Sequence, residues 1–383
     1  MKILNLAVAL GAMLSMVSCI QDEPLNAECD ITAVTLPGDV LNREPIIGND
    51  KVTLIIKNEV SLLQPLAPEF TLTPGATIDP PSGTPRMFAE EINDEEFRLI
   101  PQTYTVTSQD GEWSKTYTVE VQQNNVIDGI NLKYEFENVR LKSALGGLSH
   151  YDEFYETSMI WASANSAFAL SFQASTPDTY PTYQGDEGKT GKCVVLTTRS
   201  TGSWGEKLKK PIAAGNLFIG TFESASAVSH PLEATHFGSV FYREPTWFSG
   251  FYKYKPGETY CETDADGRFI PVPGKTDMFN LYIVMYEVTP EMQWLDGTNV
   301  LSKDNPNIIG TAEIPDRHAS DEWVEFGVPF QCREGKTIDP DKLKDGAYNM
   351  AVVMSSSQDG DYFSGAIGST LMVDELLITF KDK

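Results

Sequence analysis

The clearest indication of fold is the stretch Tyr104-Thr-Val-Thr-Ser-Gln-Asp-Gly-Glu-Trp-Ser-Lys-Thr-Tyr-Thr-Val-Glu-Val121. Apolar side chains alternate with polar ones on both sides of Asp110-Gly111, and this dipeptide between two alternating runs predicts a β-hairpin. From Cys29 to about Asn124 the chain keeps this character, with short apolar runs such as Val52–Ile56 between turns that contain proline and glycine. About seven strands in about 95 residues favour an immunoglobulin-like sandwich, which we expect over residues 29–125.

The rest of the chain, residues 126–383, also indicates an all-β domain. Aromatic residues and glycines become frequent, helix-periodic runs are scarce, and strand-like runs recur, as in Asn280-Leu-Tyr-Ile-Val-Met-Tyr-Glu-Val288. Strands do not alternate with helices, and no short repeat indicates a parallel β-helix. A segment of about 255 residues with these features predicts a jelly-roll β-sandwich that carries long loops.

The N-terminus has the pattern of a lipoprotein export signal. Lys2 precedes an apolar run from Ile3 to Val17, and Ser18-Cys19 follows. The run of about 15 residues is short for a membrane span, which favours cleavage before Cys19. We expect a signal peptide over residues 1–18, a lipid on Cys19 and a polar tether over residues 19–28, so that the protein is anchored to a membrane without spanning it. A soluble secreted protein is the alternative.

The net charge limits the ligands. The chain has 29 Lys and Arg residues against 54 Asp and Glu residues, and its formal net charge is −25. Such a charge disfavours nucleic acids and anionic lipid surfaces and repels acidic polysaccharides, so neutral glycans are the easier ligands.

The cysteines do not indicate a metal site. Those after Cys19 stand in no Cys-x-x-Cys spacing and near no histidine pair, so a zinc site has no support. One disulfide is compatible with an exported protein, but the sequence does not select a pair. The four residues concerned are Cys29, Cys193, Cys261 and Cys332.

Longer motifs resemble known families of Bacteroidetes. The segments Leu66–Phe70, Gly75–Gly83 and Tyr104–Gly111 resemble the Ig-like spacer domains of Bacteroides surface lipoproteins, and the acidic residues after Cys19 resemble the export signal of such lipoproteins. The later segment resembles the putative carbohydrate metabolism domain family. Its matching motifs are Trp161–Asn165, Ile212–Phe222, Gly250–Gly257, Ser355–Gly360 and Phe363–Asp374. The resemblance implies an outer-membrane lipoprotein, exposed on the cell surface, whose jelly roll is similar to carbohydrate-binding modules and takes part in glycan use.

Sugar recognition needs flat aromatic faces for the C–H faces of a pyranose and a few polar groups for its hydroxyls. The best cluster is Arg243–Tyr254, where Tyr252 and Tyr254 alternate with Lys253 along a predicted strand. Trp204 stands in a predicted loop between glycines. For each aromatic the alternative is packing in the core, and for the polar loop Ser355–Gly360 it is a hydrogen-bonded turn. The carbohydrate-binding candidates are Trp161, Asn165, Trp204, Arg243, Trp247, Tyr252, Lys253, Tyr254 and Ser356.

Catalytic and metal-binding residues are not selected by any motif. A glycoside hydrolase needs two placed carboxylates, and the many acidic residues offer pairs without distinguishing one. The four histidines are scattered, with no His-Glu-x-x-His run and no Gly-x-Ser-x-Gly elbow. We expect no certain cofactor. A structural calcium ion is compatible with Asp374-Glu375, where a bulge or a basic partner is the alternative, whereas Asp264–Gly267 indicates a hairpin turn first.

Three functions remain open from the sequence. The favoured one is a non-catalytic surface lipoprotein that binds poly- or oligosaccharide, together with other glycan-uptake proteins. The second is a glycoside hydrolase with an unidentified carboxylate pair, which needs a deep cleft with two carboxyl groups about 5–10 Å apart. The third is a structural or adhesive surface protein, which needs a large apolar patch without convergent polar groups.

Overall fold

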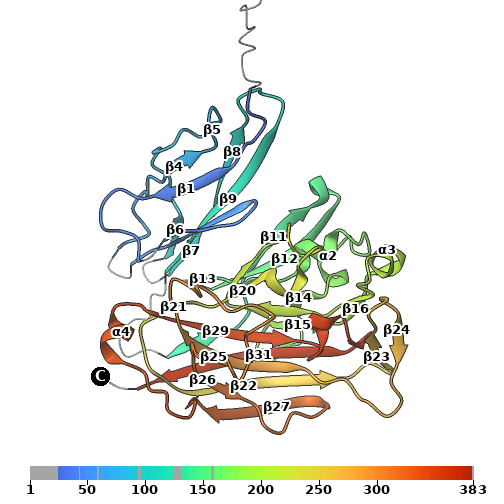
Figure 1. Cartoon of the computed structure of the whole chain (residues 1–383). Helices are drawn as coiled ribbons and strands as arrows, with labels where there is room; N and C mark the ends of the chain where they lie inside the picture. Colours follow the sequence, from blue (N-terminus) through green and yellow to red (C-terminus); the bar gives the residue numbers. More distant parts are fainter. Residues whose placement is uncertain are drawn as a thin grey trace, which may run out of the picture.

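The computed structural model describes residues 25–42, 44–57, 60–93, 96–123, 131–156 and 159–381. The expected signal peptide and the lipid-bearing Cys19 lie outside these residues. The described chain forms two β-rich domains, and Figure 1 shows the first, in blue and cyan, above the larger second domain. The all-β prediction is confirmed. Within the described ranges, helices are too short or too polar to span a bilayer.

The first domain is the predicted immunoglobulin-like sandwich. Its larger sheet has the order β2-β3-β9-β8-β5, in which β3 and β9 run parallel and the other pairs antiparallel. The strands of this sheet are β2 (Ile46–Ile47), β3 (Lys51–Ile55), β5 (Thr77–Asp79), β8 (Gln102–Thr107) and β9 (Ser114–Gln122). The remaining strands form two antiparallel pairs, β1 (Ile31–Thr35) with β4 (Glu69–Leu72) and β6 (Ala89–Asn93) with β7 (Glu96–Leu99).

The stretch from Tyr104 forms the expected hairpin of β8 and β9. Tyr104 and Val106 on β8 are buried, as are Tyr117 and Val119 on β9. Alternate side chains of a strand point to the same face, so both runs contribute one apolar face to the core. Gly111 in the turn has a φ of 73°, a conformation that glycine adopts without a Cβ clash.

The second domain is the predicted jelly-roll sandwich of two antiparallel sheets. One sheet has the order β14-β15-β31-β22-β27, with β10 also paired to β31. Its strands are β10 (Leu132–Tyr134), β14 (Thr182–Gly185), β15 (Cys193–Thr197), β22 (Pro245–Lys255), β27 (Ser320–Pro329) and β31 (Thr370–Phe380). The other has the order β18-β29-β25-β26-β28, with β21 also paired to β29. Its strands are β18 (Asn216–Phe218), β21 (Ser239–Phe241), β25 (Asn280–Glu287), β26 (Ile308–Glu313), β28 (Gln331–Cys332) and β29 (Tyr348–Ser355).

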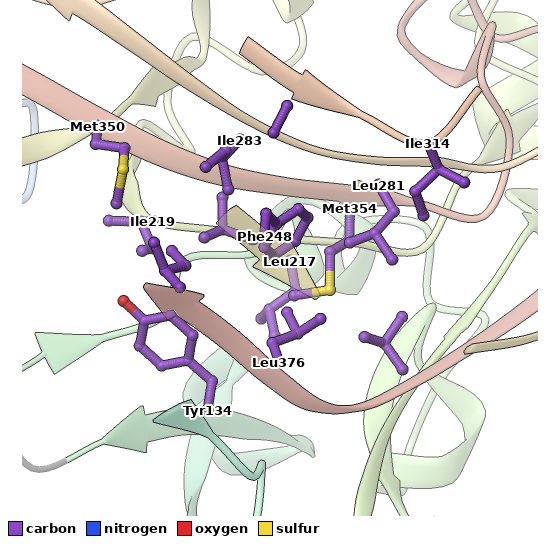
Figure 2. Packing of buried hydrophobic residues seen from close by; sticks show 14 of the residues in the cluster. Tyr134, Leu217, Ile219, Phe248, Leu281, Ile283, Ile314, Met350, Met354 and Leu376 are labelled. Carbon is purple, nitrogen blue, oxygen red and sulfur yellow. The ribbon is translucent and has the colours of Figure 1, made fainter. Parts of the chain in front are cut away.

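The main core lies between these two sheets. Figure 2 shows Phe248 and Leu376 of one sheet packed near Leu281, Ile283 and Met354 of the other. Along β22 every second residue from Phe248 to Tyr254 points inward, which places Phe248, Tyr252 and Tyr254 in the core. The alternation explains why a stretch so rich in aromatics is used for packing.

The central strands β25 and β29 are buried on both faces. Ile283 points into the main core, whereas Tyr282 and Val284 belong to a second apolar cluster with Phe218 and Phe237 on the outer face. A strand covered on both sides needs a continuous apolar run. This accounts for the uninterrupted run of buried apolar and aromatic residues at Leu281–Tyr286.

Smaller elements cover the sandwich edges. Two of the small sheets have three strands: β11 (Val139–Ala144), β12 (Ser149–Glu156) and β13 (Met159–Ile160) form one, and β23 (Tyr260–Thr263), β24 (Phe269–Pro271) and β30 (Gly365–Ala366) form the other. Two more are strand pairs: β16 (Arg199–Ser200) with β17 (Ile212–Ala213), and β19 (Gly220–Phe222) with β20 (Thr235–Phe237). The short helices are α2 (Asn165–Ala169), α3 (Gly202–Lys207) and α4 (Pro340–Lys344), and the 3-10 turns are η1 (Leu145–Gly147), η2 (Pro177–Thr179), η3 (Pro231–Glu233) and η4 (Gly360–Tyr362).

The two domains contact each other directly. The backbone N–H of Asn49 donates a hydrogen bond of 2.7 Å to the carboxylate of Glu223. Arg140 donates to the carbonyl of Leu99 at 3.3 Å, and Ile160 of the second domain is part of the first domain's apolar core. Polar and apolar contacts together therefore fix the first domain against the second.

The four cysteines of the described chain are free thiols. Cys193 and Cys261 are buried, and burial raises the pKa of the Cys193 thiol to about 12. A thiol with such a pKa stays protonated and behaves as a small apolar side chain.

Candidate functional site

A cleft of about 430 Å³ opens on the second domain. Its walls come from α2, α3, the β19–β20 hairpin and the η4 turn. These elements are far apart in sequence, and Figure 1 shows α2 and α3 together beside β14 and β16. The volume lies within the range of about 300–1,000 Å³ that is usual for small-molecule sites.

Exposed aromatic side chains form much of the apolar wall. Trp204 is 54% exposed and Phe172 is 68% exposed. Phe222 at the end of β19 and Phe363 after η4 also line the cleft. Burial of large aromatics is the rule in folded proteins, so several that stay accessible in one concavity indicate a ligand surface.

Trp204 lies on α3 and not in a loop, which corrects the expectation from its glycines. Gly202 before it has a φ of 64°, and a Cβ on Gly205 would collide with Thr201 and with the carbonyl of Lys210. Only glycine at position 205 lets the helix pack this closely. The two glycines that flank Trp204 therefore allow a short helix to pack closely at this place, and this helix positions Trp204 at the cleft.

Polar atoms that have no hydrogen-bond partner among the described residues converge on the same cleft. Asn216 accepts a hydrogen bond from the N–H of Ala164 at 2.8 Å, but its side-chain NH₂ donates to no atom of the described chain. The carboxylate of Asp361 likewise accepts no hydrogen bond from the described residues. It is accessible through the mouth of the cleft yet surrounded by protein atoms, and this desolvation raises its pKa to about 6. Amide donors and carboxylate acceptors of this kind suit sugar hydroxyls.

The polar side of the cleft continues into a small bay. Asn216, Thr235 and Asp361 line both the cleft and an adjoining space of about 30 Å³, where Asn280 and Gln358 add two more amides. On the other side, the ammonium of Lys210 lies 5.3 Å from the centre of the Phe363 ring, and burial lowers its pKa. The cleft thus has an apolar aromatic side and a polar side.

Five residues expected from the sequence to bind carbohydrate are instead buried: Trp161, Asn165, Tyr252, Tyr254 and Ser356. Trp161 packs edge-on against Tyr134 in the core, and Tyr252 and Tyr254 face the core from β22. A ligand outside the protein cannot reach these side chains, so the prediction that they contact carbohydrate is wrong.

The buried polar members of this set position the chain behind the cleft. The Asn165 side chain donates to the carbonyl of Thr182 at 2.7 Å and accepts from its N–H at 3.2 Å. The Ser356 hydroxyl accepts from the N–H of Gly215 at 2.9 Å, and the hydroxyl of Tyr254 donates to the carbonyl of Ser356 at 3.2 Å. Thr182, which Asn165 holds, exchanges two hydrogen bonds with the backbone of Asn216, and Gly215, which Ser356 holds, directly precedes Asn216 in the chain.

Three further candidates lie outside the cleft. Trp247 is 42% exposed and packs over Gly327 on the neighbouring strand β27. The ammonium of Lys253 lies 5.2 Å from the Trp323 ring, and the guanidinium of Arg243 lies 4.4 Å from the Phe380 ring. Of the nine candidates, only Trp204 lines the cleft. Phe172, Phe222, Phe363, Asn216 and Asp361 were not selected, because no local pattern marks residues that only tertiary folding assembles.

The acidic residues considered for calcium have protein partners. Asp374 accepts a hydrogen bond from the N–H of Thr190 at 3.0 Å and one from Glu375 at 2.7 Å, and the register between β22 and β31 shifts at this point. It therefore lies at a β-bulge. Asp264 accepts from Arg268 within the turn between β23 and β24. In the described part of the chain no three or more His, Cys, Asp or Glu side chains are grouped to hold a metal ion.

The buried carboxylate of Asp277 organises the loops next to the cleft. Its Oδ2 accepts hydrogen bonds from Ser357, Ser369 and the N–H of Ala366 at 2.5 to 2.8 Å, and its Oδ1 accepts from the N–H of Met278. Desolvation raises the pKa of Asp277. The polar run Ser355–Gly360 is thus a hydrogen-bonded turn network, the alternative considered for it.

These features define a two-domain β-sandwich protein with an accessible, partly aromatic and partly polar cleft on its second domain. The chain belongs to the putative carbohydrate metabolism domain family, whose profile matches residues 135–379. The profile described as SGBP, N-terminal, matches residues 31–121. The family resemblance of the sequence motifs is confirmed.

Two solved structures are similar over much of the chain. One is named a putative glycoside hydrolase from Bacteroides thetaiotaomicron VPI-5482; it is 44% identical, covers 95% of this chain and 100% of its own, and superposes with a TM-score of 0.77. The other is named a putative glycoside hydrolase from Bacteroides vulgatus ATCC 8482; it is 41% identical, covers 65% of this chain and 98% of its own, with a TM-score of 0.59. No curated protein matches the sequence.

Proposed function

We propose that this protein is a non-catalytic carbohydrate-binding lipoprotein of the bacterial cell surface. Cys19 carries the lipid, residues 19–28 form the tether, the immunoglobulin-like domain of residues 29–125 acts as a stalk, and the jelly roll of residues 126–383 binds glycan in its cleft. The carbohydrate-related family and the match of the first domain to surface glycan-binding proteins support this assignment. Other glycan-uptake proteins of the same outer membrane are the expected partners.

The observation that carries the proposal is the pairing of accessible aromatics with partner-free polar groups in one cleft. Trp204 and Phe172 offer flat faces for the C–H face of a pyranose, while Asp361 and the Asn216 amide offer an acceptor and a donor for its hydroxyls. A surface for protein adhesion needs neither of these unpaired polar groups. The net charge of −25 favours a neutral glycan.

Hydrolysis of a glycan is the second candidate. Asp361, with a pKa of about 6, has the raised value that a general acid needs. Glycoside hydrolysis also requires a second carboxyl group about 5–10 Å away across the scissile bond. Among the described residues that line the cleft, Asp361 is the one carboxylate. The arrangement therefore favours binding without cleavage.

One assay separates the two functions. The mature chain is incubated with immobilised neutral plant, microbial and host glycans, and both retention of the protein and release of shorter sugars are measured. We expect retention without products, reduced by Trp204→Ala and by Asp361→Asn. Trp247→Ala is the matched control, since Trp247 is also exposed but lies on the outer face of β22. Released products would overturn the non-catalytic assignment, and loss of retention only in Trp247→Ala would move the site to the sheet surface.

A further inference from the structure

A second pocket of about 230 Å³ lies where the two domains meet. Glu44, Ile46 and Ile55 of the first domain form one wall, and His236 and Trp294 of the second domain form the other. The sequence motifs did not mark this place, since neither domain alone contains the pocket.

The contacts between the domains hold the two walls in place. The hydrogen bond from Asn49 to Glu223 lies at the turn of the hairpin β2–β3. Ile46 on β2 and Ile55 on β3 of this hairpin line the pocket. Arg140 and Ile160 hold the domains together at other points of the junction. When the walls of a pocket are already fixed, ligand binding loses little conformational entropy of the protein.

The β19–β20 hairpin separates this pocket from the cleft. Thr221 pairs with His236, and Phe222 pairs with Thr235. Successive residues of a strand point to opposite faces, so the first pair lines the junction pocket and the second pair lines the cleft. One two-stranded ribbon is therefore the common wall of two separate binding spaces.

The junction pocket has the chemistry of a sugar site. The His236 ring stacks on the Trp294 indole, with centroids 4.1 Å apart and an interplanar angle of 26°. Burial lowers the pKa of His236, which favours the neutral imidazole, so the stacked pair presents an aromatic surface without charge. The exposed side chains of Glu44 and Gln293 add a carboxylate and an amide at the rim. A flat aromatic surface with acceptors and donors at its edge suits a pyranose ring.

We infer that the junction pocket is a second carbohydrate-binding site, formed by both domains and distinct from the cleft. Its volume is below the range of about 300–1,000 Å³ for drug-sized ligands, so it takes one or two sugar rings at a chain end or branch. This inference rests on the proposed glycan-binding function. It gives the first domain a share in ligand recognition besides its role as a stalk.

The test is ¹⁹F NMR of the mature chain labelled with 5-fluorotryptophan. The probes are cellotetraose, xylotetraose, mannotetraose and β-1,4-galactotetraose, added separately up to millimolar concentration. Trp204→Phe and Trp294→Phe assign the two resonances. We expect at least one probe to shift both resonances with two different Kd values, and Trp204→Ala to leave the Trp294 response unchanged.

The variants distinguish a real second site from an indirect effect. Glu44→Ala should weaken the response at Trp294 at least fivefold without changing that at Trp204, and Glu69→Ala, an exposed carboxylate of the same domain outside the pocket, should change neither. A Trp294 response that disappears in Trp204→Ala would refute the second site. A response at Trp204 alone overturns the inference and leaves the proposed function standing, whereas no response at either residue to any probe overturns both.

Discussion

Replacing Trp204 by alanine should weaken glycan binding about tenfold without disturbing the fold. Trp204 is 54% exposed in the free protein. A tryptophan side chain has about 250 Å² of surface, so about 130 Å² remains accessible, and a pyranose stacked on one face covers about half of it. At about 25 cal/mol per Å², losing about 60 Å² of apolar burial costs about 1.5 kcal/mol, which corresponds to about a tenfold rise in Kd.

The matched control for this variant is Trp113→Ala. Trp113 is 61% exposed in the turn between β8 and β9 of the first domain. Isothermal titration with the glycan retained in the panel assay gives Kd for both variants, and thermal unfolding gives their stability. Each substitution should leave the protein folded and lower the free energy of unfolding by at most about 3 kcal/mol, because about 100–115 Å² of each side chain is buried. An unchanged Kd in Trp204→Ala, or an equal loss in Trp113→Ala, refutes the stacking argument.

Further predictions concern Asp361 and the core. Desolvation by the protein atoms around the accessible Asp361 raises its pKa to about 6, above its ordinary value of 3.8, so its ionisation costs stability as the pH rises between these values. Asp361→Asn should therefore be more stable than the parent protein at pH 7, with no difference below about pH 4 in thermal unfolding, while its glycan Kd at pH 7 rises about tenfold through loss of a charged acceptor. A variant less stable at pH 7 contradicts this. Asp277→Ala leaves four hydrogen-bond donors of the network without their acceptor and should lose about 3 kcal/mol in urea unfolding, with Asp277→Asn closer to the parent protein; a loss below about 0.5 kcal/mol in Asp277→Ala would show that the carboxylate is not needed. Ile283→Ala, at a fully buried position of β25, should lose about 2–5 kcal/mol, whereas the half-exposed Ile270→Ala should stay within about 0.5 kcal/mol of the parent protein, and similar losses in both would contradict the assignment of the core.

Local patterns predicted the elements well where burial follows the period of a strand. The alternation around Asp110-Gly111 corresponds to the hairpin of β8 and β9, and the continuous apolar run from Leu281 corresponds to β25, which is covered on both faces. Turn chemistry and side-chain alternation act over a few residues, so a sequence contains this information directly.

The candidate site was less predictable. Tyr252 and Tyr254 alternate along a strand in the way that either a core face or a binding face requires, and nothing local shows which face the second sheet covers. Trp204 was correctly placed outside the core, but its helix depends on the contact of Gly205 with Thr201 and Lys210. Phe172 follows α2 in the chain and is exposed at the cleft, a position that no local pattern indicates.

The sequence by itself determined the two all-β domains, the acidic surface and the family. These properties depend on composition, on period and on motifs, all of which are local or additive along the chain. Tertiary structure alone decided which aromatics stay accessible, since Trp204 on α3, Phe222 on β19 and Phe363 after η4 meet only when the sandwich closes. It also decided the junction pocket, because that pocket exists only while the two domains are held in contact. Whether a side chain is buried, and which side chains meet in one cleft, depends on residues that are distant in the sequence, so only the tertiary fold determines it.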